Sequence, residues 1–399
     1  MASPPTASLL LSAAGQELLG RLADEDVSPD RALALSAELR AAYPPELVAA
    51  ALTQQALRTA ARAKFSRADQ MLFTRAGLEQ TSSELTARHA AARFAGARVV
   101  ADLCCGIGGN LVALAAAAES ALIGVDADLT SLAFARHNAA VHAPTAPTGF
   151  VCANVTELQL SGFDAVFIDP ARRDEHGRLP AGRYEPPLGW CLRLADAVPR
   201  VGIKAAPGLK RDLVPPGWET EFVAVGRELK QAMLWSPALA ADGVTSRATV
   251  LPAGDTLARP APAAPPVPQP PVPLAPPGGY LLDPSPAVTR AGLVAELARL
   301  VGAWQIDPMI AFLSSDEPLR TPFARTLRVL ESAPWHEKRF ARRLRDLGIG
   351  SADIRRRGLA GDVTQIHRRL GLRGPGAATI VLTRVQNRPW ALICTPLPA

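Results

Sequence analysis

Three aspartates each lie at or just beyond the end of a short apolar run in this chain. Asp102 lies near the end of VVADL, Asp126 ends ALIGVD, and Asp169 follows FDAVFI. Apolar runs of this length suit buried parallel strands. Because the carboxyl ends of parallel strands meet at one edge of a sheet, we expect the three carboxylates beside one ligand crevice. Carboxylates in such a crevice accept hydrogen bonds from ribose hydroxyls and from amines.

A glycine-rich loop, DLCCGIGGN, connects the first apolar run to a segment, residues 111–118, that suits a helix. Its glycines let backbone N–H groups and a helix N-terminus approach a ligand, which favours a carboxylate or a phosphate. The loop is not the dinucleotide fingerprint G-x-G-x-x-G/A, because Leu111 occupies the sixth position from Gly106. The phosphate-loop pattern G-x-x-x-x-G-K-[ST] is also missing from the sequence. The loop therefore predicts a cofactor of another class.

Each of these residues has a simpler interpretation when taken alone. Glycines after a strand are often plain turn residues, Asp126 would serve as a helix N-cap, and Asp169 with Pro170 would open a turn. A further strand, GFVCANVTEL, brings Asn154 to the same edge, within reach of an adenine. The ordered set of motifs, rather than any single residue, indicates a cofactor site.

The composition limits the class of protein. A chain of 399 residues, 48% hydrophobic, predicts two or three domains with a sizeable core. Its five cysteines are odd in number and show no C-x-x-C or metal-ligand spacing, so we expect a reducing compartment, no disulfide framework and no metal. The N-terminus lacks a basic leader and no apolar run reaches the length of a membrane span. We therefore expect a cytoplasmic protein with no membrane partner.

The clearest boundary is the Pro- and Ala-rich stretch PAPAAPPVPQPPVPLAPPGG, which ends at Gly279. Such a stretch predicts an extended, semi-rigid linker, with an SH3-type ligand as the alternative. We predict an N-terminal helical region at residues 1–95, a cofactor-binding domain at 96–251, the linker at 252–279 and a basic α+β region at 280–399. The N-terminal part has the leucine spacing of a helical bundle.

One N-terminal segment is more specific than the rest. In LFTRAGLEQTSSE, the residues Thr81 to Glu84 form a capping-box pattern that predicts a helix start. This helix leads directly into the cofactor-binding domain, so we expect the loop LFTRAGLEQT to close over the cofactor. The alternative is that capping alone explains Thr81 and Glu84.

The distal region carries the positive charge. From Arg320 to Arg388 there are sixteen Lys and Arg against five Asp and Glu, in a chain of net charge +6. In HEKRFARRLRDLG, a packed stripe of Phe340, Leu344 and Leu347 leaves the arginines facing solvent. This asymmetry predicts a nucleic-acid partner, although the excess of Arg over Lys also fits biased coding. The candidate phosphate-binding residues are Arg339, Arg342, Arg343, Arg355, Arg356, Arg357, Arg368 and Arg369.

Several of these motifs occur together in a known family. DLCCGIGGN, GVDAD and DPARR resemble the motifs of class I S-adenosylmethionine-dependent methyltransferases. KFSRADQMLFTRAGLEQT and the tail motifs DIRRRG, RRLGLRG and ATIVLTR extend the resemblance to bacterial methyltransferases with a C-terminal THUMP-like domain. The resemblance implies an α/β fold with a Rossmann-like methyltransferase sheet, S-adenosyl-L-methionine as cofactor and RNA as substrate.

The resemblance also assigns roles to residues of the cofactor site. Gly106 and Gly108 would approach the methionine part of the cofactor, while Asp102 would hold its amino group, Asp126 its ribose and Asn154 its adenine. The full set of expected cofactor-binding residues is Asp102, Cys104, Gly106, Gly108, Asn110, Asp126, Ala127, Asn154, Val155 and Asp169.

The expected catalytic residues are Asp169, Pro170 and Arg172. If the acceptor is a base amine, Asp169 and the Pro170 carbonyl would accept its N–H bonds, and Arg172 would stack on the base or hold a phosphate. DPAR is also similar to the DPPR of pyrimidine carbon-5 methyltransferases, which need a cysteine nucleophile. The next strand segment, VGIKAAPGLKRD, has no cysteine, and Cys191 fits a helix core, so we favour a nitrogen acceptor.

We therefore predict a methyltransferase that modifies an RNA base and binds RNA through its C-terminal domain. Two alternatives stay open. The chain could be a cofactor-binding RNA adaptor without transferase activity, or it could methylate a small molecule or a protein.

Overall fold

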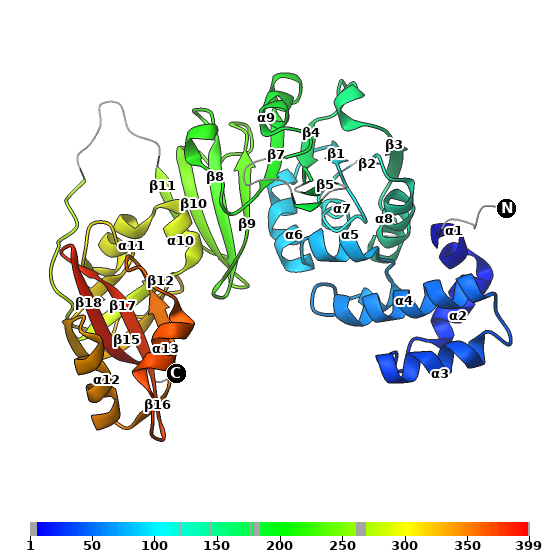
Figure 1. Cartoon of the computed structure of the whole chain (residues 1–399). Helices are drawn as coiled ribbons and strands as arrows, with labels where there is room; N and C mark the ends of the chain where they lie inside the picture. The colour runs from blue at the N-terminus through cyan, green and yellow to red at the C-terminus, as the bar shows by residue number, and fades with distance from the viewer. Residues whose placement is uncertain are drawn as a thin grey trace. The chain divides into compact units, whose positions relative to one another are not determined.

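The computed structural model describes residues 6–119, 121–143, 145–171, 173–174, 177–178, 184–260 and 269–397. The chain divides into two compact units, and Figure 1 labels most of their helices and strands. Unit 1 comprises residues 1–219 and 232–241, and unit 2 comprises residues 220–231 and 242–399. Part of the predicted linker, residues 261–268, lies outside the described residues. Residues 255–260, which composition assigned to the linker, form a strand instead.

Unit 1 begins with helices, as the leucine spacing predicts. In chain order they are α1 (Thr6–Leu11), α2 (Ala13–Arg21), α3 (Pro29–Leu39), α4 (Pro45–Ala61), the 3-10 turn η1 (Ala68–Gln70), α5 (Arg75–Gln80), α6 (Glu84–Ala91) and the 3-10 turn η2 (Ala92–Phe94). Their shared core includes Leu18 and Val48, together with Ile107 of the glycine loop. The helical region is therefore packed directly on the loop that the motifs single out.

The start of α6 differs from the capping-box expectation. Ser83, not Thr81, is the N-cap, because its side chain accepts from the backbone N–H of Thr86 at 3.4 Å. Glu84 is consequently the first helical residue and accepts from the backbone N–H of Ser66 at 2.7 Å.

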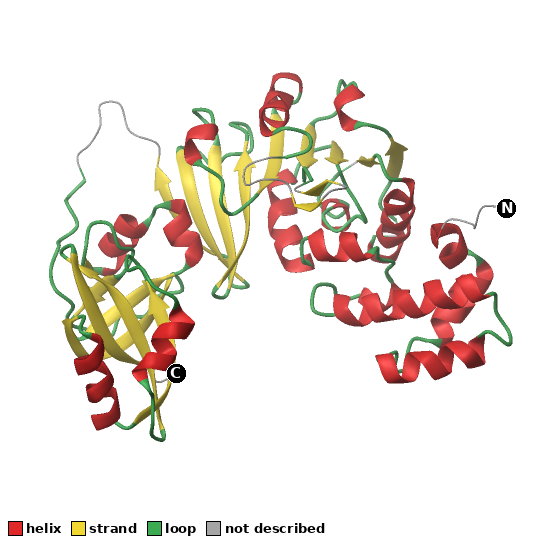
Figure 2. Cartoon of the chain, viewed as in Figure 1, coloured by secondary structure: helices red, strands yellow, loops and turns green. Residues whose placement is uncertain are grey.

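A twisted sheet forms the centre of unit 1, drawn yellow in Figure 2. Its parallel strands are β1 (Val99–Leu103), β2 (Ala121–Asp126), β3 (Thr148–Cys152), β4 (Ala165–Ile168) and β7 (Arg200–Ala205). Residues 232–235 of β9 (Glu228–Trp235) pair antiparallel with β7, which gives the order β9-β7-β4-β1-β2-β3. The chain runs from β1 outward to β3 and then returns to β4 on the other side of β1. The topological switch point, where α/β proteins bind ligands, is therefore the end of β1.

Helices α7 (Leu111–Leu114) and α8 (Leu129–His142) pack with α6 against one face of this sheet, in a core that includes Val100, Leu122 and Phe167. Helix α9 (Leu188–Ala197) contacts β7. Helix α7 is shorter than the predicted 111–118, because turns follow it. The remaining short elements of this part are η3 (Val155–Glu157), β5 (Arg173–Asp174), β6 (Gly177–Arg178) and η4 (Arg211–Leu213). The predicted α/β fold with a Rossmann-like sheet is confirmed.

Unit 2 contains two groups of strands. In the first group, β10 (Val244–Leu251) pairs parallel with β8 (Glu219–Val225) and antiparallel with β11 (Asp255–Pro260). The second is a seven-stranded sheet in the order β13-β14-β12-β15-β18-β17-β16. Its strands are β12 (Tyr280–Pro284), β13 (Trp304–Gln305), β14 (Leu313–Ser315), β15 (Ala324–Pro334), β16 (Ile349–Arg356), β17 (Gly376–Val385) and β18 (Arg388–Pro396).

The helices of unit 2 are α10 (Pro286–Ala291), α11 (Val294–Val301), α12 (Glu337–Asp346) and α13 (Val363–Leu370). Phe340 and Leu344 of α12 are buried, as the predicted stripe requires, and pack with Ile380 and Leu382 of β17. Val381, between them in sequence, packs on the opposite face of the sheet. Both faces of this sheet are therefore covered by apolar side chains.

The last two strands of unit 2 form a hairpin. Strands β17 and β18 pair antiparallel around a two-residue turn at Gln386 and Asn387. Both turn residues have positive φ, +49° and +64°, which matches the right-handed twist of paired strands. Across the described residues, no helix combines the length and the apolar character needed to span a bilayer.

Candidate active site

The glycine loop joins β1 to α7 and is held by the end of β2. The Asp126 carboxylate accepts from the backbone N–H of Gly106 at 2.8 Å and from that of Asp128 at 3.0 Å. Gly106 has a φ of +54°, which a residue without a side chain adopts at little cost. Gly108 is needed for close packing as well, because an added Cβ would lie 3.1 Å from the Cα of Ala135 in α8. The loop geometry therefore depends on both glycines that the sequence singled out.

A cavity of about 640 Å³ lies against this loop. It is lined by residues that follow β1 and β4, by residues from the end of β2 to the start of α8, and by the N-terminal helical region: Thr74, Ala76, Gly77, Glu79, Gln80, Thr81, Cys104, Cys105, Gly106, Ile107, Gly109, Asn110, Asp126, Asp128, Ser131, Asp169, Pro170 and Ala171. Its volume is in the range of small-molecule and cofactor sites. Asp126 and Asp169 meet at this cavity, as the strand-end pattern predicts.

Asp102 is the most perturbed acid of the site. Its side chain is fully buried, and within the described part of the chain neither carboxylate oxygen has a hydrogen-bond partner. Burial, reinforced by the carboxylates of Asp169 and Asp126, raises the pKa of Asp102 well above its usual value, and Lys204 opposes this rise. A buried carboxyl without donors is costly, so Asp102 would be stabilised by a hydrogen-bond donor that the described residues do not supply.

Asp169 lies at the centre of a polar cluster. Lys204 at the end of β7 donates to its Oδ2 at 2.6 Å, and the side-chain amide of Asn110 donates to the same oxygen at 3.4 Å. The described residues provide no donor to Asp169 Oδ1, although Asp169 lines the cavity. The lysine side chain is only 6% exposed, so it holds the carboxylate from beneath the cavity surface.

The segment that follows Asp169 is fixed by its backbone. Ala171 and Glu185 exchange two hydrogen bonds, at 2.8 and 3.0 Å. Pro170 and Ala171 line the cavity, so the Pro170 carbonyl belongs to the same wall as Asp169. Arg172, the third expected catalytic residue, lies outside the described residues.

The opposite wall of the cavity comes from α5 and the residues around it. A Cβ added to Gly109 would lie 1.6 Å from Oγ1 of Thr81, and one added to Gly77 would lie 2.6 Å from Cγ2 of Ile107. The glycine loop and α5 are thus in contact at two points where only glycine fits. Lys64 fixes the end of α5 by donating to the carbonyls of Leu78 at 2.6 Å and Thr81 at 3.1 Å.

The strand-like residues 71–73 that lead into α5 are held by buried polar side chains. Asn138 of α8 donates to the carbonyls of Leu72 and Ile107, each at 2.9 Å, and accepts from the N–H of Leu72 at 2.8 Å. Arg58 of α4 donates to the Met71 carbonyl at 2.9 Å, and burial lowers the pKa of this arginine to about 10. The wall formed by α5 is therefore anchored to both α4 and α8.

The residues expected to contact the adenine lie beyond the end of β3 and outside the cavity lining. Asn154 is exposed and caps η3, where its Oδ1 accepts from the N–H of Thr156 at 3.1 Å. Val155 is buried and Ala127 is exposed. Five of the expected cofactor-binding residues do not line the cavity: Asp102, Gly108, Ala127, Asn154 and Val155. Of the expected cofactor-binding residues, those on the cavity are Cys104, Gly106, Asn110, Asp126 and Asp169.

Sequence reasoning missed several residues of the site. Asp128 lines the cavity and caps α8, accepting from the N–H of Ser131 at 3.0 Å, so Asp128 rather than Asp126 is the helix cap at this strand end. The signal in the sequence was the DAD motif itself, in which Asp128 lies two residues after Asp126. Lys204 was visible only as a strand-end lysine, and nothing in the sequence marks Asn138 among the polar residues of α8.

The cysteines near the site are not activated nucleophiles. Cys191 in α9 is fully buried, as expected for a helix-core cysteine, and burial raises its pKa to about 12. Burial also raises the pKa values of Cys104 and Cys105. Cys104 has a φ of +58°, an uncommon left-handed conformation for a residue with a side chain. Among the described residues, no group of His, Cys, Asp and Glu is placed to hold a metal ion.

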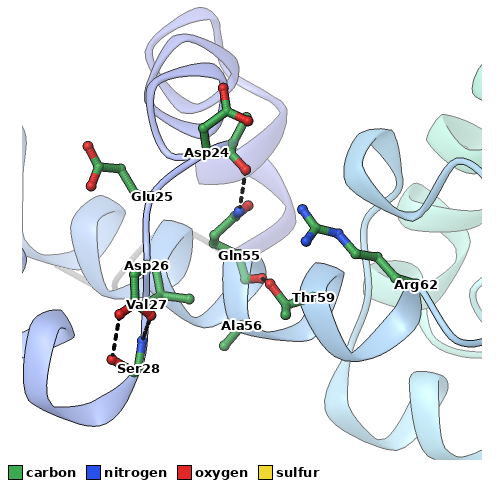
Figure 3. Close-up of a pocket in the computed structure, with 10 residues that line it drawn as sticks. Asp24, Glu25, Asp26, Val27, Ser28, Gln55, Ala56, Thr59 and Arg62 are labelled. Carbon is green, nitrogen blue, oxygen red and sulfur yellow. Dashed lines mark hydrogen bonds between the residues drawn. The ribbon is translucent and has the colours of Figure 1, made fainter.

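A second cavity, of about 590 Å³, lies between the α2–α3 loop and α4 (Figure 3). Its polar groups largely engage one another: Gln55 donates to the Ala23 carbonyl at 3.0 Å, and Asp26 accepts from the Ser28 N–H at 2.8 Å. Arg62, drawn at its edge, pairs with Asp69 at 2.9 Å. This arrangement has the character of a solvated surface hollow.

The expected phosphate-binding arginines of unit 2 fall into different environments. Arg339, Arg342 and Arg368 are exposed on α12 and α13, and no ion pair among the described residues includes them. Arg343 pairs with Glu331, and Arg369 with Glu337 at 3.7 Å. These two helices contact each other, and we call their exposed arginines the basic surface of α12 and α13.

The arginines of β16 are more constrained. Arg355 pairs with Asp353 at 3.1 Å, and Arg356 donates to the Leu359 carbonyl. Arg357 pairs with nearly buried Asp283 at 3.0 Å and stacks over Phe312, with its guanidinium carbon 4.9 Å from the ring centroid. Arg357 therefore belongs to the packed interior of unit 2 more than to its surface.

Comparisons with known proteins agree with this geometry. The family described as a methyltransferase domain matches residues 100–173, the family described as THUMP domain-like matches residues 324–396, and a domain of unknown function matches residues 4–61. Two strains of Mycobacterium tuberculosis, CDC 1551 and H37Rv, each have a relative described as an uncharacterized S-adenosylmethionine-dependent methyltransferase. Each is 36% identical over 338 residues, covering 82% of this chain and 89% of the relative.

A solved structure supports the fold over nearly the whole chain. It is a crystal structure from Porphyromonas gingivalis W83, assigned to the methyltransferases, with a TM-score of 0.76 and 20% identity. The match covers 96% of this chain and 99% of that one, so the likeness includes the helical region and the C-terminal sheet as well as the central strands.

Proposed function

Because the chain belongs to the class I S-adenosylmethionine-dependent methyltransferases, we propose that it methylates a nitrogen atom of an RNA base. The observation that carries the proposal is Asp169, which lines the cavity while Lys204 and Asn110 hold only one of its two oxygens. Among the described residues no group donates to the other oxygen, Oδ1, so it can accept a hydrogen bond from an acceptor amine.

The cavity fits S-adenosylmethionine, which supplies an activated methyl group when bound. The Asp126 carboxylate lines the cavity beside the loop. The Asp102 carboxyl does not line it, but it lies two residues before Cys104, which does, and among the described residues it lacks the donor that an amino group provides. We propose that Asp102 serves the amino group, that Asp126 serves the ribose hydroxyls, and that α5 shields the donor from water. Exclusion of water strengthens the polar contacts made inside such a site.

The acceptor would be held by the wall opposite α5. Asp169 Oδ1 and the Pro170 carbonyl are both acceptors, so together they suit the two N–H bonds of an exocyclic amine. Accepting these bonds orients the nitrogen lone pair toward the methyl group, and orientation is the main contribution that a methyl-transfer site makes. Lys204 neutralises the charge of Asp169 and fixes the position of its Oδ2. A base inside a duplex would have to be flipped out to reach this position.

RNA as the substrate rests on unit 2. The THUMP domain-like match covers α12, α13 and the strands around them, where exposed arginines outnumber acidic residues. Free guanidinium groups on a surface attract phosphates and make binding dependent on salt. We propose that Arg339, Arg342 and Arg368 make such contacts.

The proposal is tested with purified protein, labelled S-adenosylmethionine and RNA from cells that lack the gene. We expect label in RNA, with the modified nucleoside identified by mass spectrometry. The Asp169→Asn variant should bind the cofactor in calorimetry but transfer little label. A wild-type protein that binds RNA without labelling it would instead be an adaptor. Label entering a metabolite or protein extract but not RNA would refute the RNA substrate.

A further inference from the structure

Two acidic residues in unit 2 are shared among four arginines. The first, Asp283 of β12, is almost fully buried and accepts from Arg227 at 2.6 Å and from Arg357 at 3.0 Å. Arg227 comes from the turn between β8 and β9, and its side chain is about two-fifths exposed, at 39%. Each oxygen of Asp283 therefore already has a cationic partner.

The second acid, Asp353 of β16, accepts from Arg355 at 3.1 Å and lies 3.7 Å from Arg325 of β15. Arg325 also donates to Oγ1 of Thr379, and its Nε is buried without a hydrogen-bond partner in the described structure. Burial, followed by the nearby cations Arg227 and Arg355, lowers the pKa of Arg325. Four guanidinium groups thus share two carboxylates, and the group as a whole is short of negative charge.

This cluster lies on a different face of the sheet from the basic surface of α12 and α13. Ala352 and Ile354 of β16 pack into the core beneath those helices. Because side chains alternate along a strand, Asp353 and Arg355 point to the other face. Arg357 follows the same alternation and stacks on Phe312, which belongs to the core of that other face.

An open cavity of about 500 Å³ adjoins Arg325 where β18 ends. Its lining contains no acidic residue and consists of Leu319, Arg320, Thr321, Pro322, Ala324, Arg325, Thr326, Pro396 and Leu397. Guanidinium groups beside a hollow of this size are the donors that a phosphate group prefers, whereas the Thr326 hydroxyl already donates to the Leu319 carbonyl. A nearby Arg355, with a side chain 41% exposed, can turn from Asp353 to such an anion.

We propose that Arg325 and Arg355 form a binding site for a phosphate group of RNA at the end of β18, supported by Arg227 and Arg357. The proposal rests on the proposed RNA substrate. It adds a second phosphate contact on the sheet face opposite the α12 and α13 arginines. A phosphate here supplies the negative charge that the cluster lacks, without displacing the buried Asp283.

The test uses the full chain and measures binding of a single-stranded RNA oligonucleotide by fluorescence anisotropy over a range of salt concentrations. Arg355→Gln should weaken binding roughly tenfold, as expected for a lost charge-assisted contact, and lower the salt slope by about one. Asp353→Asn is the matched control on the same strand, and it should tighten binding because it removes a competing acid. Thermal melting of Arg355→Gln should stay close to wild type, since its ion pair with Asp353 is about half exposed. Asp353→Asn leaves the four guanidinium groups with one carboxylate, so it should melt somewhat lower in the absence of RNA.

The variant Arg342→Gln on α12 separates failure of this inference from failure of the RNA proposal. If Arg342→Gln weakens RNA binding while Arg355→Gln and Asp353→Asn leave it unchanged, the phosphate site is refuted and the RNA substrate stands. If the wild-type protein binds no RNA, the substrate proposal fails, and the site fails with it. Oligonucleotides with a 5′-phosphate and with a 5′-hydroxyl show whether the Arg355 effect arises from a terminal or an internal phosphate.

Discussion

Replacing Asp102 with asparagine should make the protein more stable and, at the same time, unable to hold its cofactor tightly. The carboxyl is fully buried and has no hydrogen-bond donor among the described residues, and its pKa is raised by burial and by Asp169 and Asp126. An Asp in the unfolded chain releases its proton near pH 3.9, as in model peptides, whereas the folded protein keeps it to higher pH. The folded state therefore binds more protons in this range, and stability falls as pH rises through it, by about 1.4 kcal/mol per pH unit.

Asp102→Asn has the same shape and no such proton, so its stability advantage over wild type should grow by about 1.4 kcal/mol for each pH unit above about pH 4 and level off above the folded pKa. Urea unfolding of both proteins at several pH values between about 5 and 7 measures this difference. Cofactor affinity, measured by calorimetry, should fall roughly 10- to 100-fold, because one charge-assisted hydrogen bond is lost. A stability difference that stays constant over the whole range would show that the folded carboxyl is already ionised, and the reasoning would be wrong.

Three other substitutions probe the two walls of the cavity. Lys204→Gln removes the cation from beneath the acceptor wall, so kcat should fall roughly 10- to 100-fold through misplacement of the carboxylate, with the cofactor Kd nearly unchanged in calorimetry. Gly109→Ala should abolish cofactor binding because its Cβ would collide with the Thr81 side chain, and the double variant with Thr81→Gly should recover binding. Gly20→Ala is the control and should behave as wild type, because a Cβ there has no neighbour within 4 Å. Asn138→Ala leaves three buried backbone groups without partners and should cost about 2–4 kcal/mol in urea unfolding.

The parts of the fold that sequence predicts well are those where local pattern and tertiary structure agree. The run VVADL became β1 with the predicted ends. The segment after the glycine loop was harder, because its run of alanines favours a helix while the structure turns after Leu114. The strand Asp255–Pro260 was hidden in a Pro-rich context and depends on pairing with β10, which no local pattern shows.

The site residues likewise divide into those that the sequence predicts and those that only the fold reveals. Acids at strand ends could be found because the geometry of parallel sheets brings successive strand ends to one edge, so Asp126 and Asp169 meet at the cavity. Lys204 gains its meaning only from its distance to Asp169, and Asn138 only from carbonyls more than 30 residues away in the chain. Such contacts have no spacing rule, because the residues that share them are brought together by packing of whole helices. Asn154 shows the converse limit, since its position on a strand end does not reveal that its side chain caps η3.

The N-terminal helices owe their importance to how the cavity wall is supported. Helix α5 has only six residues, too few to be stable alone, and its position depends on side chains from longer helices. Gln54 and Arg58 of α4 bind the backbone just before it, and Lys64, which follows α4, binds the carbonyls at its end. Because α4 packs in the same core as Leu78 of α5 and Ile107 of the glycine loop, one apolar cluster holds both α5 and the loop in place. The helical region therefore supports the wall of the proposed cofactor site.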